Sequence, residues 1–111
     1  MRQGKVYYNH HLAGTITETH EGEFVFQYDL QFVVDHPDDF ITFTMPVKNA
    51  AYTEKRLFPF FEGLIPEGWL LDIASETWKI NRNDRMGLLL ACCRNCIGAV
   101  SVIPIPEANE E

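Results

Sequence analysis

The chain has 111 residues, of which 46% are apolar and 13% aromatic, and its 16 acids against 9 lysines and arginines give a formal charge of −7. This length and apolar share predict one domain that folds without help. The sequence contains neither a membrane span of about 18 apolar residues nor a signal-peptide core, which predicts a cytoplasmic protein. The acidic balance argues against a direct nucleic-acid partner, because lysine and arginine supply nonspecific affinity for phosphates.

Three segments in the first third of the chain have the alternation and the β-branched and aromatic residues of strands. The first two, at 6–11 and 15–19, flank a turn or bulge at Leu12–Gly14 and are expected to pair as a hairpin. The third, at 24–28, follows a turn at 20–23 and places its aromatic residues on one side. An antiparallel meander is the simplest arrangement of these strands.

The segment that follows breaks regular structure and then returns to it. Residues 35–40 read DHPDDF, and Pro37 lacks an N–H while the short acids favour turns. A fourth short strand is expected at Ile41–Met45, where Pro46 ends it. Residues 48–55 are then expected to form a polar connection.

The apolar period changes toward three to four residues after this connection, which indicates helices. Pro59 suits the first turn of a short buried helix within 57–65 that closes over the sheet. A second helix is predicted from Glu67 to Trp78, and a third from Arg85 to Cys92, with its N-cap among residues 81–84.

The second helix is expected to be an amphipathic core helix. Its predicted core face consists of Leu70, Ile73, Ala74 and Thr77. Asp72 and Glu76 oppose that face, and Trp78 lies on its flank, where a structural role is expected.

The chain returns to strand character at 98–103, and Pro104 and Pro106 are expected to end this last strand. The order of strands, helices and strand predicts an α+β fold, in which about three helices cover a small, mainly antiparallel sheet or partial barrel. One domain is expected over 1–104, and the acidic segment 105–111 is expected to be disordered.

The chemistry-bearing residues give little sign of an enzyme. The sequence has no Walker loop, no glycine-rich dinucleotide motif, no zinc-protease motif and no serine-hydrolase motif. Cys92, Cys93 and Cys96 cluster within five positions, but no second cysteine pair completes a zinc site, so buried packing residues at a helix end are favoured. We therefore expect a noncatalytic protein without metal or cofactor.

The other polar groupings also have simpler explanations. His10 and His11 are adjacent in a strand and so point to opposite faces, which favours a solvent-facing turn entrance over a metal site. His20 and His36 lie nearby in sequence, far from the cysteines. The acids of the turn segments, Asp38, Asp39, Glu21 and Glu23, have no apolar pocket that would raise a carboxyl pKa.

Trp69 is the most informative single residue. It lies in the first turn of the second predicted helix, at the edge of the apolar face toward Asp72 and Glu76. An exposed tryptophan there would indicate a partner, because tryptophan is enriched among interface hot spots. The alternative is that Trp69 covers the edge of the core, since most tryptophans are largely buried.

Five motifs follow one another along the chain from about Gly4 to Pro104: GKVYYNHHLAGTITET, FVFQYD, ITFTMPV, LFPFFEGLIPEGWLLD and CIGAVSVIP. In this order they resemble the N-terminal subdomain of HipA-type serine/threonine kinases. The most specific is FPFFEGLIPEGW, followed by the late Gly-Ala-Val-x-Val strand. HipA kinases continue into a larger catalytic part, and no residue here matches its ATP-binding, catalytic or metal-binding positions, so the resemblance transfers no catalytic residue.

A separate chain of this kind is similar to the small protein, HipS, of three-gene HipBST toxin–antitoxin systems. The resemblance implies a noncatalytic antitoxin that binds and restrains a HipA-like kinase, in a system whose DNA-binding component is a separate helix-turn-helix protein. We expect the contact to involve Trp69, Glu67, Asp72 and Glu76. Two alternatives stay open: an obligate accessory lobe that completes a split kinase or mediates assembly with the DNA-binding partner, and a small redox or metal protein that uses the three cysteines.

Overall fold

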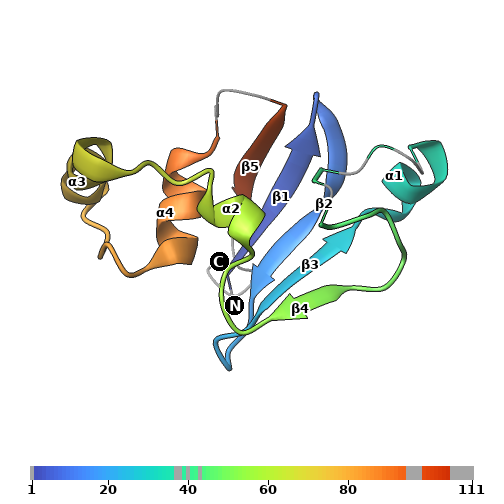
Figure 1. Cartoon of the computed structure of the whole chain (residues 1–111), viewed down its shortest axis with the longest axis horizontal. Helices are drawn as coiled ribbons and strands as arrows, with labels where there is room; N and C mark the ends of the chain where they lie inside the picture. The colour runs from blue at the N-terminus through green and yellow to red at the C-terminus, as the bar shows by residue number, and fades with distance from the viewer. Residues whose placement is uncertain (1, 37–38, 40, 43, 95–98, 106–111) are drawn as a thin grey trace.

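The structure is a computed structural model that describes residues 2–36, 39, 41–42, 44–94 and 99–105, apart from the side chain of Trp69. Its elements, in chain order, are β1 (Arg2–Tyr8), β2 (His11–Glu18), β3 (Phe24–Tyr28), α1 (Leu30–Asp35), β4 (Tyr52–Glu54), α2 (Pro59–Glu62), α3 (Gly68–Trp78), α4 (Arg85–Cys92) and β5 (Val100–Ile105) (Figure 1). None of the helices in the described part of the chain is long and apolar enough to cross a membrane.

The five strands form one sheet in the order β4-β3-β2-β1-β5, and every neighbouring pair is antiparallel. The last strand of the chain therefore lies beside the first, although the helices lie between them in the sequence. This arrangement confirms the predicted α+β class.

The turn of the first hairpin lies before the segment 12–14, for which the sequence predicted either a turn or a bulge. Asn9 and His10 have positive φ angles of 49° and 73°, so they make the tight turn and β2 begins at His11. Val6 pairs with Gly14 and Tyr7 pairs with Leu12, so Ala13 is the extra residue of a β-bulge. The segment 12–14 is thus the bulge, and the exposed His10 belongs to a turn and not to a strand.

The predicted fourth strand is wrong. Of Ile41–Met45, the described residues 41, 42, 44 and 45 form bends and a turn, and β4 lies in the segment expected to be a polar connection. The physical reason is Tyr28, whose hydroxyl donates to the Met45 carbonyl and accepts from the Ile41 N–H at 3.2 Å. Ile41 and Met45 are buried as anchors of a loop, so their apolar character does not indicate a strand.

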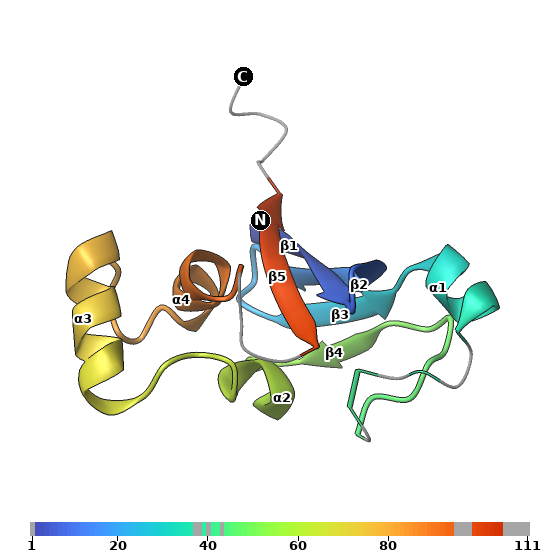
Figure 2. The same cartoon turned by 90° about the horizontal axis from the view of Figure 1, so that it is seen from above.

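The core lies between one face of the sheet and the helices α2 and α4 (Figure 2). The predicted aromatic side of β3 is confirmed, since Phe24, Phe26 and Tyr28 are all buried. Phe61 of α2 is fully buried, and its ring centroid lies 5.6 Å from that of Phe26. Pro59 occupies the first turn of α2, as predicted, because its missing N–H leaves no helical bond unmade there.

The last strand runs further than predicted. Pro104 lies inside β5, opposite Gly4 of β1, and the strand continues to Ile105. Val102, two residues earlier, directs its N–H away from β1 and donates it to the Cys93 carbonyl at 2.8 Å. Pro104 faces the same outer side, so its missing N–H removes no bond to β1. Residues 106–111 of the expected acidic tail lie outside the described residues.

Asp84 joins the start of α4 to the sheet. Its carboxylate caps α4 by accepting from the Gly87 N–H at 3.1 Å, and it accepts two hydrogen bonds from Arg2 at 2.7 and 2.9 Å. Arg2 also pairs with Glu18 at 2.6 Å. The hydrogen bonds from Arg2 hold the pKa of Asp84 below its ordinary value of 3.8.

We expect Asp84→Asn to lower the free energy of unfolding at pH 7 by about 1 kcal/mol, because asparagine still caps the helix but the charged pair is lost. The pKa of Asp84 is depressed in the folded state, so the wild-type advantage is present above the unfolded pKa of about 4 and disappears as the pH falls through the folded pKa. Urea titrations of both proteins between pH 2 and 7 measure this. Glu21→Gln, an exposed turn residue, is the control, and an Asp84→Asn deficit that persists unchanged at pH 2 would contradict the assignment.

Candidate docking surface on helix α3

Helix α3 lies at one end of the molecule, opposite α1, and packs mainly against α4 (Figures 1 and 2). Its C-cap is Lys79, which has a left-handed φ of 55° and donates its N–H to the Ser75 carbonyl. Ile80 donates to the same carbonyl at 3.0 Å, and the Ser75 hydroxyl donates to the Ile80 carbonyl at 2.6 Å. These bonds fix the end of a helix that has little contact with the sheet.

The predicted core face of α3 is wrong. Leu71 is buried at 9% exposure, whereas Leu70 and Ile73 are 51% and 50% exposed, and Thr77 is exposed as well. Successive residues are separated by roughly 100° around a helix, so the buried side is rotated by about that angle from the predicted one. Ala74, at the boundary between the two sides, is half-buried.

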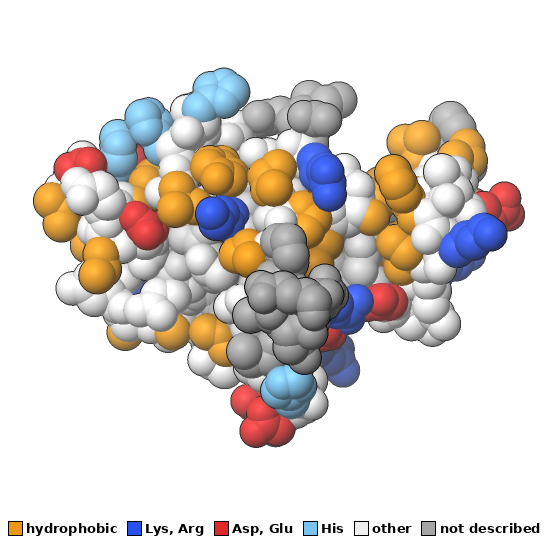
Figure 3. All heavy atoms as spheres, turned by 180° about the vertical axis from the view of Figure 1, so that it is seen from behind, with side chains coloured by type: hydrophobic (Ala, Val, Ile, Leu, Met, Phe, Trp, Pro, Cys, Tyr) orange, Lys and Arg blue, Asp and Glu red, His pale blue; other side chains and the backbone are white. Residues whose placement is uncertain are grey.

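Leu70, Ile73 and Thr77 therefore form an exposed face, which we call the α3 stripe. Hydrophobic side chains gather over this end of the molecule in the view from behind (Figure 3). Exposed apolar residues that form a contiguous patch with a polar rim mark interaction sites more often than isolated ones do. Among the described residues, Leu30 and Val34 of α1 form the other such pair, at the opposite end of the molecule.

The acidic residues that we predicted at this site lie around the stripe. Glu67, Asp72 and Glu76 are all exposed. Asp72 forms an ion pair with Arg82 at 2.9 Å, which anchors the loop after α3 to the helix. The helix thus presents an apolar stripe beside a row of carboxylates.

Trp69 lies in the first turn of α3, and its side chain lies outside the described residues. By helical periodicity, position 69 falls between positions 73 and 76, whose side chains are exposed. The backbone therefore places position 69 next to the α3 stripe. Its role in binding a partner stays a prediction.

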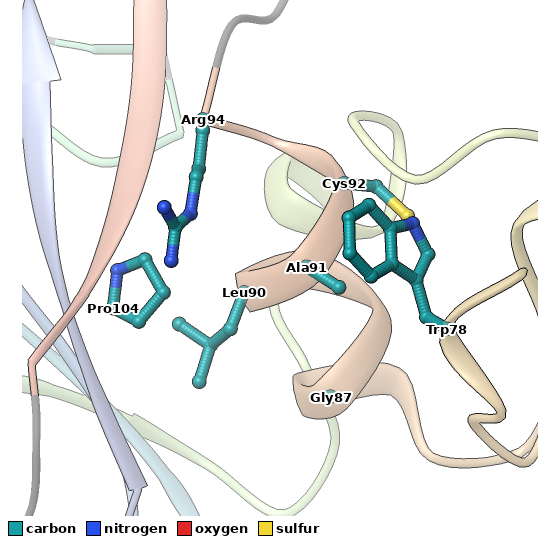
Figure 4. A pocket seen from close by; sticks show the side chains of 7 residues that line it. All are labelled: Trp78, Gly87, Leu90, Ala91, Cys92, Arg94 and Pro104. Carbon is teal, nitrogen blue, oxygen red and sulfur yellow. The ribbon is translucent and has the colours of Figure 1, made fainter.

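Trp78 was expected to be structural, but it is 56% exposed and lines a groove of about 570 Å³ between α3, α4 and β5. In Figure 4 the indole lies beside Ala91 and Cys92, while Arg94 extends along the other side toward Pro104. Leu90 forms the apolar floor between them. The groove is not evident from the sequence, because its walls come from three separated segments.

The edges of the sheet offer poor sites for strand addition. On the outer side of β5 the Val102 N–H is already bonded to Cys93, and Pro104 has no N–H. At the other edge, β4 is three residues long. A partner that paired by backbone hydrogen bonds would need a longer open edge. Helix α3 and the groove are therefore the better candidates for docking.

The remaining groups singled out in the sequence do not converge on a site. Cys93 is buried, with its Sγ 3.3 Å from the Leu64 carbonyl, Cys92 is half-buried, and Cys96 lies outside the described residues. His36 pairs with the exposed Asp39 at 3.1 Å, and its ring centroid lies 4.9 Å from that of His11, a proximity the sequence did not indicate. Within the described ranges, no three histidine, cysteine or acidic side chains could together hold a metal ion. Asp38 is outside the described residues.

These observations define the class of the protein: it is an α+β domain with an exposed helix beside its core. Comparison with known proteins identifies the family: the model of the HipA N-terminal domain matches residues 4–103. The chain belongs to the HipA N-terminal domain family.

Two relatives support this membership. An uncharacterized protein of Haemophilus influenzae is 30% identical over 102 residues, which cover 92% of each chain. A solved structure described as the N-terminal domain of HipA toxin superimposes with a TM-score of 0.73 at 28% identity, covering 96% of this chain and 95% of that one. The family places the chain in a HipA-related toxin–antitoxin context.

Proposed function

We propose that this protein is a cytoplasmic, noncatalytic antitoxin that binds a HipA-like serine/threonine kinase as a separate chain and restrains it. The observation that carries the proposal is the α3 stripe, because a core helix of an isolated domain would bury Leu70 and Ile73, which are half exposed here. Family membership supplies the class of partner, since HipA N-terminal domains are associated with HipA-type toxins.

Charge and domain extent support the same proposal. The net charge of −7 suits a partner whose nucleotide-phosphate site carries positive potential. The Haemophilus relative aligns over 92% of its own length, so this domain makes up most of that relative. A helix-turn-helix protein in the same complex is compatible with the proposal but not required by it.

Coexpression with the cognate kinase tests the proposal. We expect cells that express the kinase alone to stop growing, and cells that also express this chain to grow and to yield a co-purifying complex. Unchanged toxicity together with no co-purification would overturn the proposal.

Trp69→Ala tests the predicted contact. We expect the variant to keep its fold, as judged by circular dichroism, and to lose neutralisation, because truncating a tryptophan hot spot costs about 2 kcal/mol or more of binding energy. Val34→Ala, at an exposed position of α1 far from α3, is the control for truncating a side chain. A folded Trp69→Ala chain with undiminished neutralisation would show that Trp69 is a core residue.

The second candidate function is an obligate accessory lobe that completes the kinase. It is favoured by the superposition on nearly the whole N-terminal domain of HipA toxin, which indicates that this chain has the same fold as that domain of the toxin. Autophosphorylation separates the two functions: a restrained kinase is active alone, whereas a kinase that needs completion is active only with this chain.

A further inference from the structure

The groove beside Trp78 combines an apolar floor with one cation. Leu90 and Pro104 supply the floor, and the exposed Arg94 stands at its side (Figure 4). A groove of about 570 Å³ is large enough to hold one or two partner side chains. Its shape and apolar lining therefore favour an anchoring side chain over a flat contact.

Arg94 differs from three other arginines near the helices, each of which has an acidic partner. Arg2, Arg82 and Arg85 each form an ion pair, with Asp84, Asp72 and Glu62 respectively. No acid in the described part of the chain pairs with Arg94, although the protein carries an excess of acids. A guanidinium at the edge of an apolar groove is suited to bind a carboxylate in two parallel hydrogen bonds.

The groove lies at the C-terminal end of the helix that carries the α3 stripe, because Trp78 is the last residue of α3 and also a wall of the groove. Trp78 is rotated by about 100° from its neighbour Thr77, toward the side of α3 that carries Leu71, so a partner on the α3 stripe reaches the groove around the end of the helix. The outer edge of β5, which borders the groove, cannot extend the sheet at Val102 or Pro104. A segment in the groove would consequently be held by side-chain contacts and not as a sixth strand.

We infer that the groove receives a segment of the docked kinase that presents an apolar side chain next to an aspartate or glutamate. The apolar side chain packs on Leu90 and against Trp78, and the carboxylate accepts hydrogen bonds from Arg94. This inference rests on the proposed function and adds the chemistry of the partner segment to it. A second copy of this chain, which is also rich in acids, is the competing occupant.

The test is the affinity of the purified chain for the purified kinase, measured by isothermal titration calorimetry. We expect Arg94→Glu and Trp78→Ala each to weaken binding about tenfold or more, because a charge pair is reversed in one variant and an aromatic wall is removed in the other. Arg56→Glu, the same charge change at an exposed arginine outside the groove, is expected to stay within about twofold of the wild type. Circular dichroism confirms that each variant is folded.

Each outcome is decisive. Replacing acids of the kinase by lysine, one at a time, should identify one substitution that restores the affinity of Arg94→Glu. If Arg94→Glu and Trp78→Ala both bind like the wild type, the groove inference fails while the proposed function stands. If the wild type does not bind the kinase, both fail. If sedimentation shows that the wild type self-associates and Arg94→Glu does not, the occupant is a second copy and the inference is overturned.

Discussion

Ile73→Asp is expected to abolish co-purification with the kinase while the chain remains folded. Ile73 is 50% exposed in the free protein, so an aspartate costs little there before the partner binds. In the complex the carboxylate would be buried in an apolar contact without a partner, which we expect to weaken binding by roughly 100-fold or more. Thermal unfolding of the variant and calorimetry against the kinase measure the two effects separately.

The chain offers a matched control at its opposite end. Val34 of α1 is 72% exposed, so Val34→Asp makes the same kind of change on another helix, which is far from α3 (Figure 1). We expect Val34→Asp to bind the kinase like the wild type. Equal losses of affinity in Val34→Asp and Ile73→Asp would show that added charge, and not the α3 stripe, governs binding.

Gly14→Ala is expected to destabilise the fold by about 2–4 kcal/mol, the largest effect on stability that we anticipate from a single methyl group. A Cβ at Gly14 would lie 2.3 Å from the backbone oxygen of Gln27 and 2.9 Å from the ring of Phe26. The oxygen belongs to the neighbouring strand, so relief requires the sheet to move at the bulge. Urea unfolding followed by circular dichroism measures the loss.

Gly63→Ala is the control for glycine replacement. Its φ of −66° suits any residue, and an added Cβ would come no closer than 3.4 Å to the nearest backbone oxygen. We expect a change within about 1 kcal/mol, in the stabilising direction, because alanine restricts the unfolded chain. If Gly14→Ala proved as harmless as Gly63→Ala, the close approach of β2 and β3 at the bulge would be contradicted.

The periodicity of apolar residues predicts those elements well whose bounds depend on residues close to them in the sequence. The boundaries of α4 are as predicted, because Asp84 caps the helix and buried apolar residues follow it directly. The β4 strand was missed because its sequence, Tyr-Thr-Glu, is short and follows a polar run. Ile41–Met45 was misassigned because Tyr28, which is distant in sequence, buries both ends of that segment in a loop.

The docking surface was only partly predictable. The pattern of α3 indicates an apolar side and an acidic side, but it does not reveal which side meets a neighbour. The helix packs mainly on α4 through the side that carries Leu71, and this contact leaves Leu70 and Ile73 in solvent. The groove at Trp78 and Arg94 could not be predicted, because its walls come from α3, α4 and β5, and the sequence does not reveal that β5 lies beside α4.

The central claim is that this chain binds a HipA-like kinase and restrains it. The most direct measurement is the rate of phosphorylation by the purified kinase as this chain is titrated into the assay. We predict that the rate falls saturably to a low plateau, and that Ile73→Asp leaves it unchanged. A rate that rises with added chain would contradict restraint and favour the accessory lobe, and a rate that does not respond to the wild type would contradict both functions.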